Sequence, residues 1–150
     1  MAEAANRRPR RGRSAARELA LQALYQWQLG GQLGQDVALE FLAERMTQNA
    51  DEDYFKELVL QVTARSEALD LALGELSDRP VVQLDPVEHG ILLIGMYELA
   101  HRPEIPWRVI VNEAVELCRR YGASDGHRFV NALLDRAARQ HRALETGAAG

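Results

Sequence analysis

The sequence of 150 residues has one cysteine, one lysine and no uninterrupted apolar run of the ~18 residues that cross a membrane. The single cysteine, Cys118, cannot form an internal disulfide, which fits the cytoplasm. The basic first residues lead into no apolar stretch with a cleavage site, so no secretory signal is expected. We therefore expect a cytoplasmic protein of one compact domain, which can fold without a metal or a disulfide.

The sequence also lacks the motifs of common catalytic and metal sites. It contains no G-x-x-x-x-G-K, no G-x-G-x-x-G after a strand, no H-E-x-x-H and no C-x-x-C. The four histidines lie far apart, with no spacing that brings metal ligands together. Cys118 lies on an apolar helical stripe, where a packed thiol is commoner than a nucleophile. We predict no catalytic residue, no metal and no cofactor, and hence a protein that acts by binding.

Positive charge is concentrated at the start of the chain. Residues 1–17 hold six arginines and one glutamate, a net charge of +5, whereas the other 133 residues hold 12 basic and 21 acidic side chains, a net charge of -9. All basic side chains except Lys56 are arginines, whose planar guanidinium grips phosphate and stacks on bases. The pattern favours RNA as a partner. A solubility tail and a short mitochondrial transit peptide are the alternative interpretations.

Apolar residues recur at helical spacing almost throughout, and the alternation typical of strands is nearly absent. Six or seven helices with short loops are expected, an all-α bundle. The first helix should begin with Ser14 as its N-cap and end at Gly30 and Gly31. Residues 1–13 would then form a flexible basic arm. A third helical segment, capped by Asp51, is so long that we expect a break near its Arg65 and Ser66.

Pro80 separates two halves, which we predict to be subdomains 14–79 and 80–145 of one domain, followed by a frayed tail at 146–150. The apolar residues of the connector after Pro80 should pack inward; they are Val81, Val82 and Leu84. The next helix has strong start signals, namely an N-cap, a proline at the first position and a carboxylate three residues after the cap: Asp85, Pro86 and Glu88. This helix is apolar almost all round and should be central and buried. Ser124 or Asp125 should open the last helix.

Three segments together resemble the NusB family of transcription antitermination factors. They are AARELALQALYQWQ at 15–28, MYELAHRPEIP at 96–106 and IPWRVIVNEAVELCRRYGASDGHRFVNALLDRAAR at 105–139. The resemblance covers about residues 10–140 in order. It implies an all-α fold of about seven helices in two packed three-helix bundles. It also implies binding of single-stranded boxA RNA in nascent ribosomal transcripts together with NusE, a small-subunit ribosomal protein. The complex would join RNA polymerase with other Nus factors and suppress premature termination.

The resemblance also implies site residues. The arginines before the first apolar stripe match the family's basic N-terminus, although Ser14 and Ala15 stand where some relatives have arginines. With the start of the last helix they give the expected RNA-binding set: Arg10, Arg11, Arg13, Arg17, Asp125, Arg128 and Phe129. Phe129 also lies on the core stripe, so packing is the alternative there.

Two residues, Tyr25 and Glu88, match positions at the NusE interface. Helix packing is the alternative for Tyr25, and capping is the alternative for Glu88. Two other functions stay open for the whole chain: an RNA-positioning module that works with a ribosomal RNA methyltransferase, and a helical adaptor that binds protein only. Self-association as a homodimer is a further expectation when NusE is absent.

Overall fold

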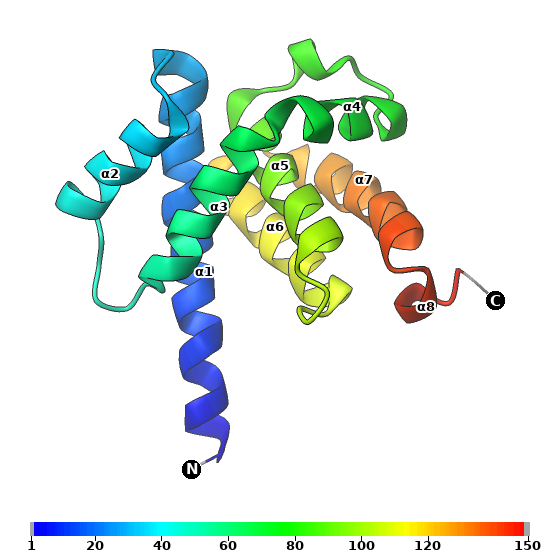
Figure 1. Cartoon of the computed structure of the whole chain (residues 1–150). Coiled ribbons are helices and arrows are strands. Elements are labelled where there is room, and N and C mark those ends of the chain that lie inside the picture. The colour runs from blue at the N-terminus through cyan, green and yellow to red at the C-terminus, as the bar shows by residue number, and fades with distance from the viewer. Residues whose placement is uncertain (1, 149–150) are drawn as a thin grey trace. The chain divides into compact units, whose positions relative to one another are not determined.

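A computed structural model describes residues 2–148, with side chains from Arg11 onward, and these residues form eight α-helices and one 3-10 turn without any strand (Figure 1). The predicted all-α class is confirmed. The chain divides into two compact units, residues 1–64 and 65–150, and each unit is described by itself below. The expected frayed tail at 146–150 falls partly outside the described residues.

The first unit is a three-helix bundle in which each helix contacts the other two. Its helices are α1 (Ala2–Gly30), α2 (Gly34–Glu44) and α3 (Glu52–Ala64). The rings of Phe41 on α2 and Phe55 on α3 stack at 6.0 Å between centroids, and Leu24 of α1 is fully buried. This apolar centre holds the three helices together.

The start of α1 differs from the prediction. Ser14 was expected to be the N-cap, but it lies inside a helix that begins at Ala2. Arginine and alanine, which dominate this segment, both favour helix, and the carbonyl of Gly12 accepts a hydrogen bond from the backbone N–H of Asp51, 3.0 Å away. That bond ties the basic segment to the beginning of α3.

The other predicted boundaries of this unit are confirmed. Gly31 follows α1 with a φ of 70°, a conformation that favours glycine. Asp51 caps α3, because its carboxylate accepts a hydrogen bond of 3.0 Å from the backbone N–H of Tyr54. The long third segment does break, since α3 ends at Ala64 and the next helix begins at Ser66.

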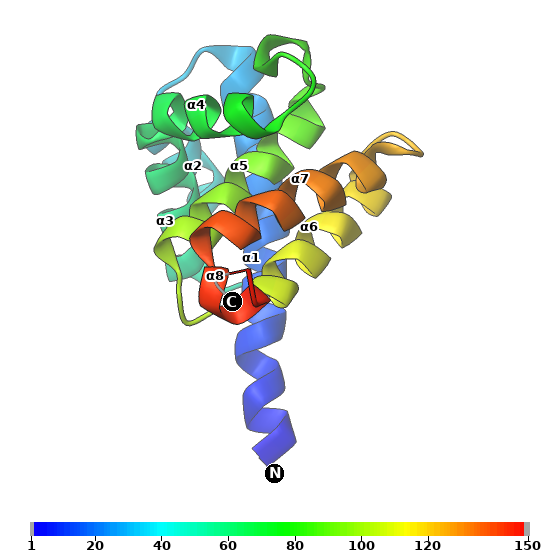
Figure 2. The ribbon, with the colours of Figure 1, turned by 90° about the vertical axis from the view of Figure 1, so that its right-hand side faces the viewer.

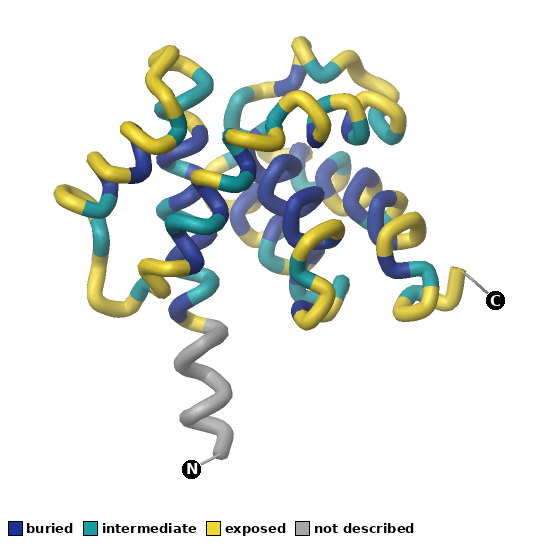
Figure 3. The backbone as a smooth tube through the Cα atoms, in the orientation of Figure 1, coloured by how far each residue is buried: buried dark blue, intermediate teal, exposed yellow. Residues whose placement is uncertain are grey.

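The second unit is built around one buried helix, α5. Its elements are α4 (Ser66–Leu76), the 3-10 turn η1 (Val81–Gln83), α5 (Pro86–His101), α6 (Trp107–Tyr121), α7 (Gly126–His141) and α8 (Ala143–Thr146). Helix α5 contacts α4, α6 and α7, and Figures 2 and 3 show α7 beside α6 and buried backbone along most of α5. Gly95 allows the close approach of α7, since a Cβ there would lie 2.8 Å from Leu134. The predicted central helix is confirmed.

Two details around Pro80 differ from the expectations. The division between the units falls at Ala64 and Arg65 rather than at Pro80, because α4 packs on α5 and α7. The connector buries Leu84 but leaves Val82 92% exposed. A 3-10 turn has three residues per turn, so it cannot direct adjacent valines to the same side.

The C-terminal end of α5 is closed by a residue that the sequence did not single out, Arg142. Its side chain is buried and donates to three main-chain carbonyl groups at 2.8–2.9 Å, those of Leu99, Arg102 and Ile105. A fourth, longer bond reaches the carbonyl of Glu98, and the carboxylate of Glu145 pairs with the guanidinium. The last turn of a helix leaves carbonyl groups without helical partners, and one guanidinium satisfies several of them here.

We predict that Arg142→Ala destabilises the protein by about 3 kcal/mol or more, because it leaves several buried carbonyl groups without donors. Arg139→Ala is the matched control, since Arg139 lies three residues earlier, in the last turn of α7, is exposed and pairs only with Asp135; it should change the free energy of unfolding by less than about 0.5 kcal/mol. Urea denaturation followed by circular dichroism measures both. Equal losses in the two variants would contradict the capping role.

Candidate nucleic-acid interface

The basic start of α1 is fixed on the first turn of α3 by one aromatic ring. Tyr54 is buried, and the guanidinium carbons of Arg13 and Arg17 lie 5.4 Å and 5.6 Å from its ring centroid. A cation over an aromatic face is attracted by the ring's negative charge density. The exposed carboxylates of Asp51, Glu52 and Asp53 stand in the same turn. The ring contact therefore holds the part of α1 around Arg13 and Arg17 against the start of α3.

The four predicted arginines are not equivalent. Arg11 is exposed, Arg13 is half-buried and Arg17 is only 2% exposed, while the side chain of Arg10 lies outside the described residues. The buried guanidinium of Arg17 does not face solvent, so the expected phosphate contact is not available to it. Arg17 instead packs the arginine segment against Tyr54. Arg11 and Arg13 are the described members of this set that a phosphate can reach.

The start of α7 carries the second predicted group. Asp125 is the N-cap residue and Arg128 lies in the first turn; both are exposed, and the Asp125 carboxylate makes no capping hydrogen bond. Phe129 is half-buried, and its ring is covered by the guanidinium of Arg79, 4.2 Å from the ring centroid. Phe129 is thus neither a fully buried core residue nor an open stacking platform.

Arg79, which the sequence did not single out, also contacts Glu88. One of its nitrogens, Nη1, lies 3.7 Å from the Glu88 carboxylate, which is almost fully buried. A side chain on Gly126 would collide with that carboxylate, so the carboxylate fills the space beside the start of α7. Capping of α5 falls to Asp85, whose carboxylate accepts from the backbone N–H of Val87 at 2.7 Å. The buried Glu88 side chain is therefore not available to a partner, contrary to the expectation.

Tyr25 is accessible on the surface of α1. It is 44% exposed on α1, and Leu29, four residues further along the same helix, is 60% exposed. Residues four apart lie on the same face of a helix. Packing between helices therefore does not account for Tyr25, and the two side chains form an apolar strip open to solvent.

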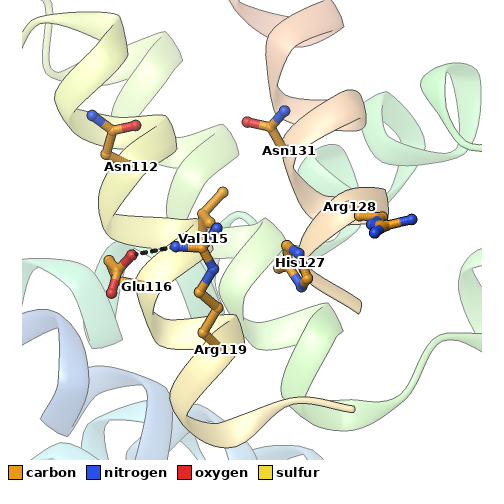
Figure 4. Close-up of a pocket in the computed structure, with 7 residues that line it drawn as sticks. All are labelled: Asn112, Val115, Glu116, Arg119, His127, Arg128 and Asn131. Atoms are coloured by element: carbon orange, nitrogen blue, oxygen red, sulfur yellow. Dashed lines mark hydrogen bonds and ion pairs between the residues drawn. The ribbon is translucent and has the colours of Figure 1, made fainter. Parts of the chain in front are cut away.

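A polar groove of about 310 Å³ runs between α6 and α7 (Figure 4). Val115 contributes an apolar side chain, and the polar lining comes from both helices: Asn112, Glu116, Arg119, His127, Arg128 and Asn131. The two asparagines belong to the NEAVEL and FVN elements. Their helical spacing from Glu116 and His127 is the signal that could have placed them on the faces of this groove.

Cys118 is a packed thiol, as predicted. It is fully buried on α6, and burial together with the carboxylates of Glu88 and Asp85 raises its pKa to about 11. A nucleophilic cysteine needs a lowered pKa. Among the side chains that the structure describes, no three metal-ligating residues come together, and no described helix has the length and apolar character of a membrane span.

Comparison with known proteins identifies relatives of this chain. Residues 14–139 match the model of the NusB family. The "Transcription antitermination protein NusB" of Nitrosococcus oceani is 50% identical over 133 residues, which are 89% of each chain. That of Halorhodospira halophila is 48% identical over 124 residues, 83% of this chain and 79% of the other.

Solved structures of NusB proteins have the same fold. A crystal structure of antitermination factors NusB and NusE in complex with dsRNA contains a chain with 26% sequence identity and a TM-score of 0.78, covering 87% of this chain and 98% of that one. A structure of T. maritima NusB gives a TM-score of 0.76 at 26% identity, covering 86% and 92% of the two chains. The fold and the order of its helices are therefore shared with these structures.

The raised pKa of Cys118 predicts a pH dependence. The folded state holds the thiol proton more tightly than the unfolded state, whose pKa is near 9.0, so this contribution to stability is present below pH 9 and declines between pH 9 and pH 11. The difference in unfolding free energy between the wild type and Cys118→Ala should shrink over that interval. Urea titrations at pH 8, 9, 10 and 11 measure it. A constant difference would contradict a raised pKa.

Proposed function

This chain belongs to the NusB family, and we propose that it binds the boxA element of nascent ribosomal RNA transcripts together with NusE. As a family member it is a non-enzymatic transcription antitermination factor. In the proposed assembly it acts in the cytoplasm and joins RNA polymerase with other Nus factors, which suppresses premature termination. Its relatives carry the name of antitermination proteins rather than of methyltransferases, and this favours the proposal over a module of a modifying enzyme.

One observation carries the RNA-binding part: the arginine-rich start of α1 is held against α3 with Arg11 exposed and Arg13 within reach of solvent. Guanidinium groups neutralise phosphates and release counterions, which supplies affinity irrespective of sequence. At the start of α7 the exposed Asp125 adds an acceptor of hydrogen bonds and the exposed Arg128 adds a donor. A protein-only adaptor would leave these cationic groups without a role.

The partner-binding part rests on the strip of Tyr25 and Leu29. Exposed aromatic side chains are typical anchors of protein interfaces, and the acidic body of the chain, with a net charge of -9 outside residues 1–17, suits a basic ribosomal protein. We place NusE on this strip. When NusE is absent, the same strip supports self-association.

The charge of the arginine segment is tested by changing Arg10, Arg11 and Arg13 together to Ala; Arg17 stays unchanged because it is buried. Binding of boxA RNA with NusE present should weaken. The plot of log affinity against log salt should become shallower by about 2 in slope, since each single-strand phosphate contact contributes about 0.7. Fluorescence anisotropy between 50 and 300 mM salt measures both quantities.

The control variant changes three exposed arginines of the second unit to Ala, namely Arg108, Arg136 and Arg139, and thus removes the same charge. This variant should keep most of the wild-type affinity for boxA RNA and the wild-type dependence of that affinity on salt. Single-stranded boxA, a permuted single strand and a double-stranded form are compared in the same assay. An unchanged slope in the first variant would remove the arginine segment from the RNA interface, and equal binding of boxA and permuted RNA would contradict the proposed function.

The apolar strip is tested by Tyr25→Ala. We expect NusE to bind about tenfold more weakly, because truncation of an interface aromatic costs 1 to 2 kcal/mol or more. Leu71→Ala is the control, since Leu71 is 73% exposed on α4 and should leave the affinity unchanged. Isothermal titration calorimetry measures both. If the two variants bind NusE alike, the strip is not its site.

A further inference from the structure

The groove between α6 and α7 has a lining that suits an anionic ligand with a flat polar edge. Glu116, its one carboxylate, is hydrogen-bonded to Arg119 at 3.0 Å, which cancels its charge. Arg128 stands at the rim and leaves the groove cationic, so a metal ion or a basic peptide is disfavoured. The arrangement follows the helical repeat, because Asn112, Glu116 and Arg119 occupy one face of α6 while His127 and Asn131 lie four apart on α7.

The two asparagines give the groove its recognition chemistry. Asn112 and Asn131 are exposed, and Figure 4 shows their amides on facing helices at the same end of the groove. Neither amide has a partner among the described side chains. Each amide presents a donor beside an acceptor, the pattern that pairs with N6 and N7 of adenine. Because both side chains are exposed, a base edge can reach their amides.

His127 supplies a flat face next to these amides. Its imidazole is half-buried and lines the groove one turn before Asn131. Unstacked bases of single-stranded RNA are held on aromatic faces, histidine included, while their edges are read by hydrogen bonds. Stacking surface, edge-reading amides and a cationic rim thus occur together in one groove.

We propose that the α6–α7 groove holds one unstacked adenine of the bound RNA. The amides of Asn112 and Asn131 bind the edge of the base, the His127 imidazole stacks on its face, and Arg128 contacts an adjoining phosphate. This inference rests on the proposed function and adds to it a site that reads sequence, whereas the arginines of α1 neutralise phosphate irrespective of sequence.

The test is the affinity of boxA RNA for the full chain with NusE present, measured by fluorescence anisotropy. Asn112→Ala with Asn131→Ala should weaken binding about tenfold, since a bidentate contact to a base is worth about 1 to 3 kcal/mol. Both positions are exposed helical sites where alanine is well tolerated. Gln140→Ala is the matched control, because it removes an exposed amide from α7 outside the groove; it should bind like the wild type.

The identity of the base is tested with RNAs in which each adenine in turn is replaced by 7-deazaadenine, which lacks the N7 acceptor. One replacement should weaken wild-type binding severalfold, and the same replacement should cost nothing further in the double asparagine variant. His127→Ala should lose about fivefold or more of the affinity, whereas His127→Phe, which keeps a stacking face, should retain it.

The outcomes separate the two ideas. If wild-type protein with NusE prefers boxA to permuted RNA but the double asparagine variant behaves like Gln140→Ala, the groove is not a base site and the proposed function stands. If the double variant loses NusE affinity with RNA absent, the groove contacts protein and the inference is wrong. If wild-type protein does not distinguish boxA from permuted RNA, the proposed function fails and the inference fails with it.

Discussion

The position of the basic segment depends on two guanidinium groups that share the ring of Tyr54. Two like charges placed this close would repel each other in an apolar site. Here the ring face attracts both, and α3 carries one carboxylate at its N-cap and two in its first turn. Arg17 is buried in this contact and Arg13 partly so. The segment before them therefore continues as helix from a fixed point.

In the second unit, the corresponding constraint is the buried carboxylate of Glu88. A buried charge requires a partner, and Arg79 provides it from the connector between α4 and α5 while its guanidinium covers Phe129. Gly126 lets the start of α7 lie close against this carboxylate, which would have to shift to make room for a Cβ there. Glu88 and Arg79 thus pack against the first turn of α7. The exposed residues there, Asp125 and Arg128, face solvent.

The sequence predicts the parts of this fold that depend on local signals. The caps Asp51 and Asp85, the stop at Gly31 and the break before Ser66 each follow from a few adjacent residues, and all are confirmed. The all-round apolar character of α5 also predicts its central position. These features require no knowledge of what lies across the core.

What the sequence could not predict depends on contacts between residues far apart in the chain. In the sequence Arg17 is one more cation of a basic segment. It is buried only because the fold brings Tyr54 next to it. Glu88 looks like part of a cap until Arg79 and Gly126 are placed around it, and Arg142 gives no local sign that it closes a helix more than 40 residues earlier. In each case a charged side chain has its role set by tertiary packing, which overrides the simpler expectation of a solvated or capping residue.

The spacing of two surfaces along α1 bears on the proposed joint binding of RNA and NusE. Arg11 and Tyr25 are 14 residues apart on one uninterrupted helix, a spacing of about 21 Å at 1.5 Å per residue. The cationic start and the apolar strip are therefore held at a fixed distance without any hinge. A protein bound to the strip and an RNA bound to the arginines would be kept side by side, and each contact would raise the effective concentration of the other. Cooperation between the two ligands then follows from the stiffness of a single helix and needs no conformational change.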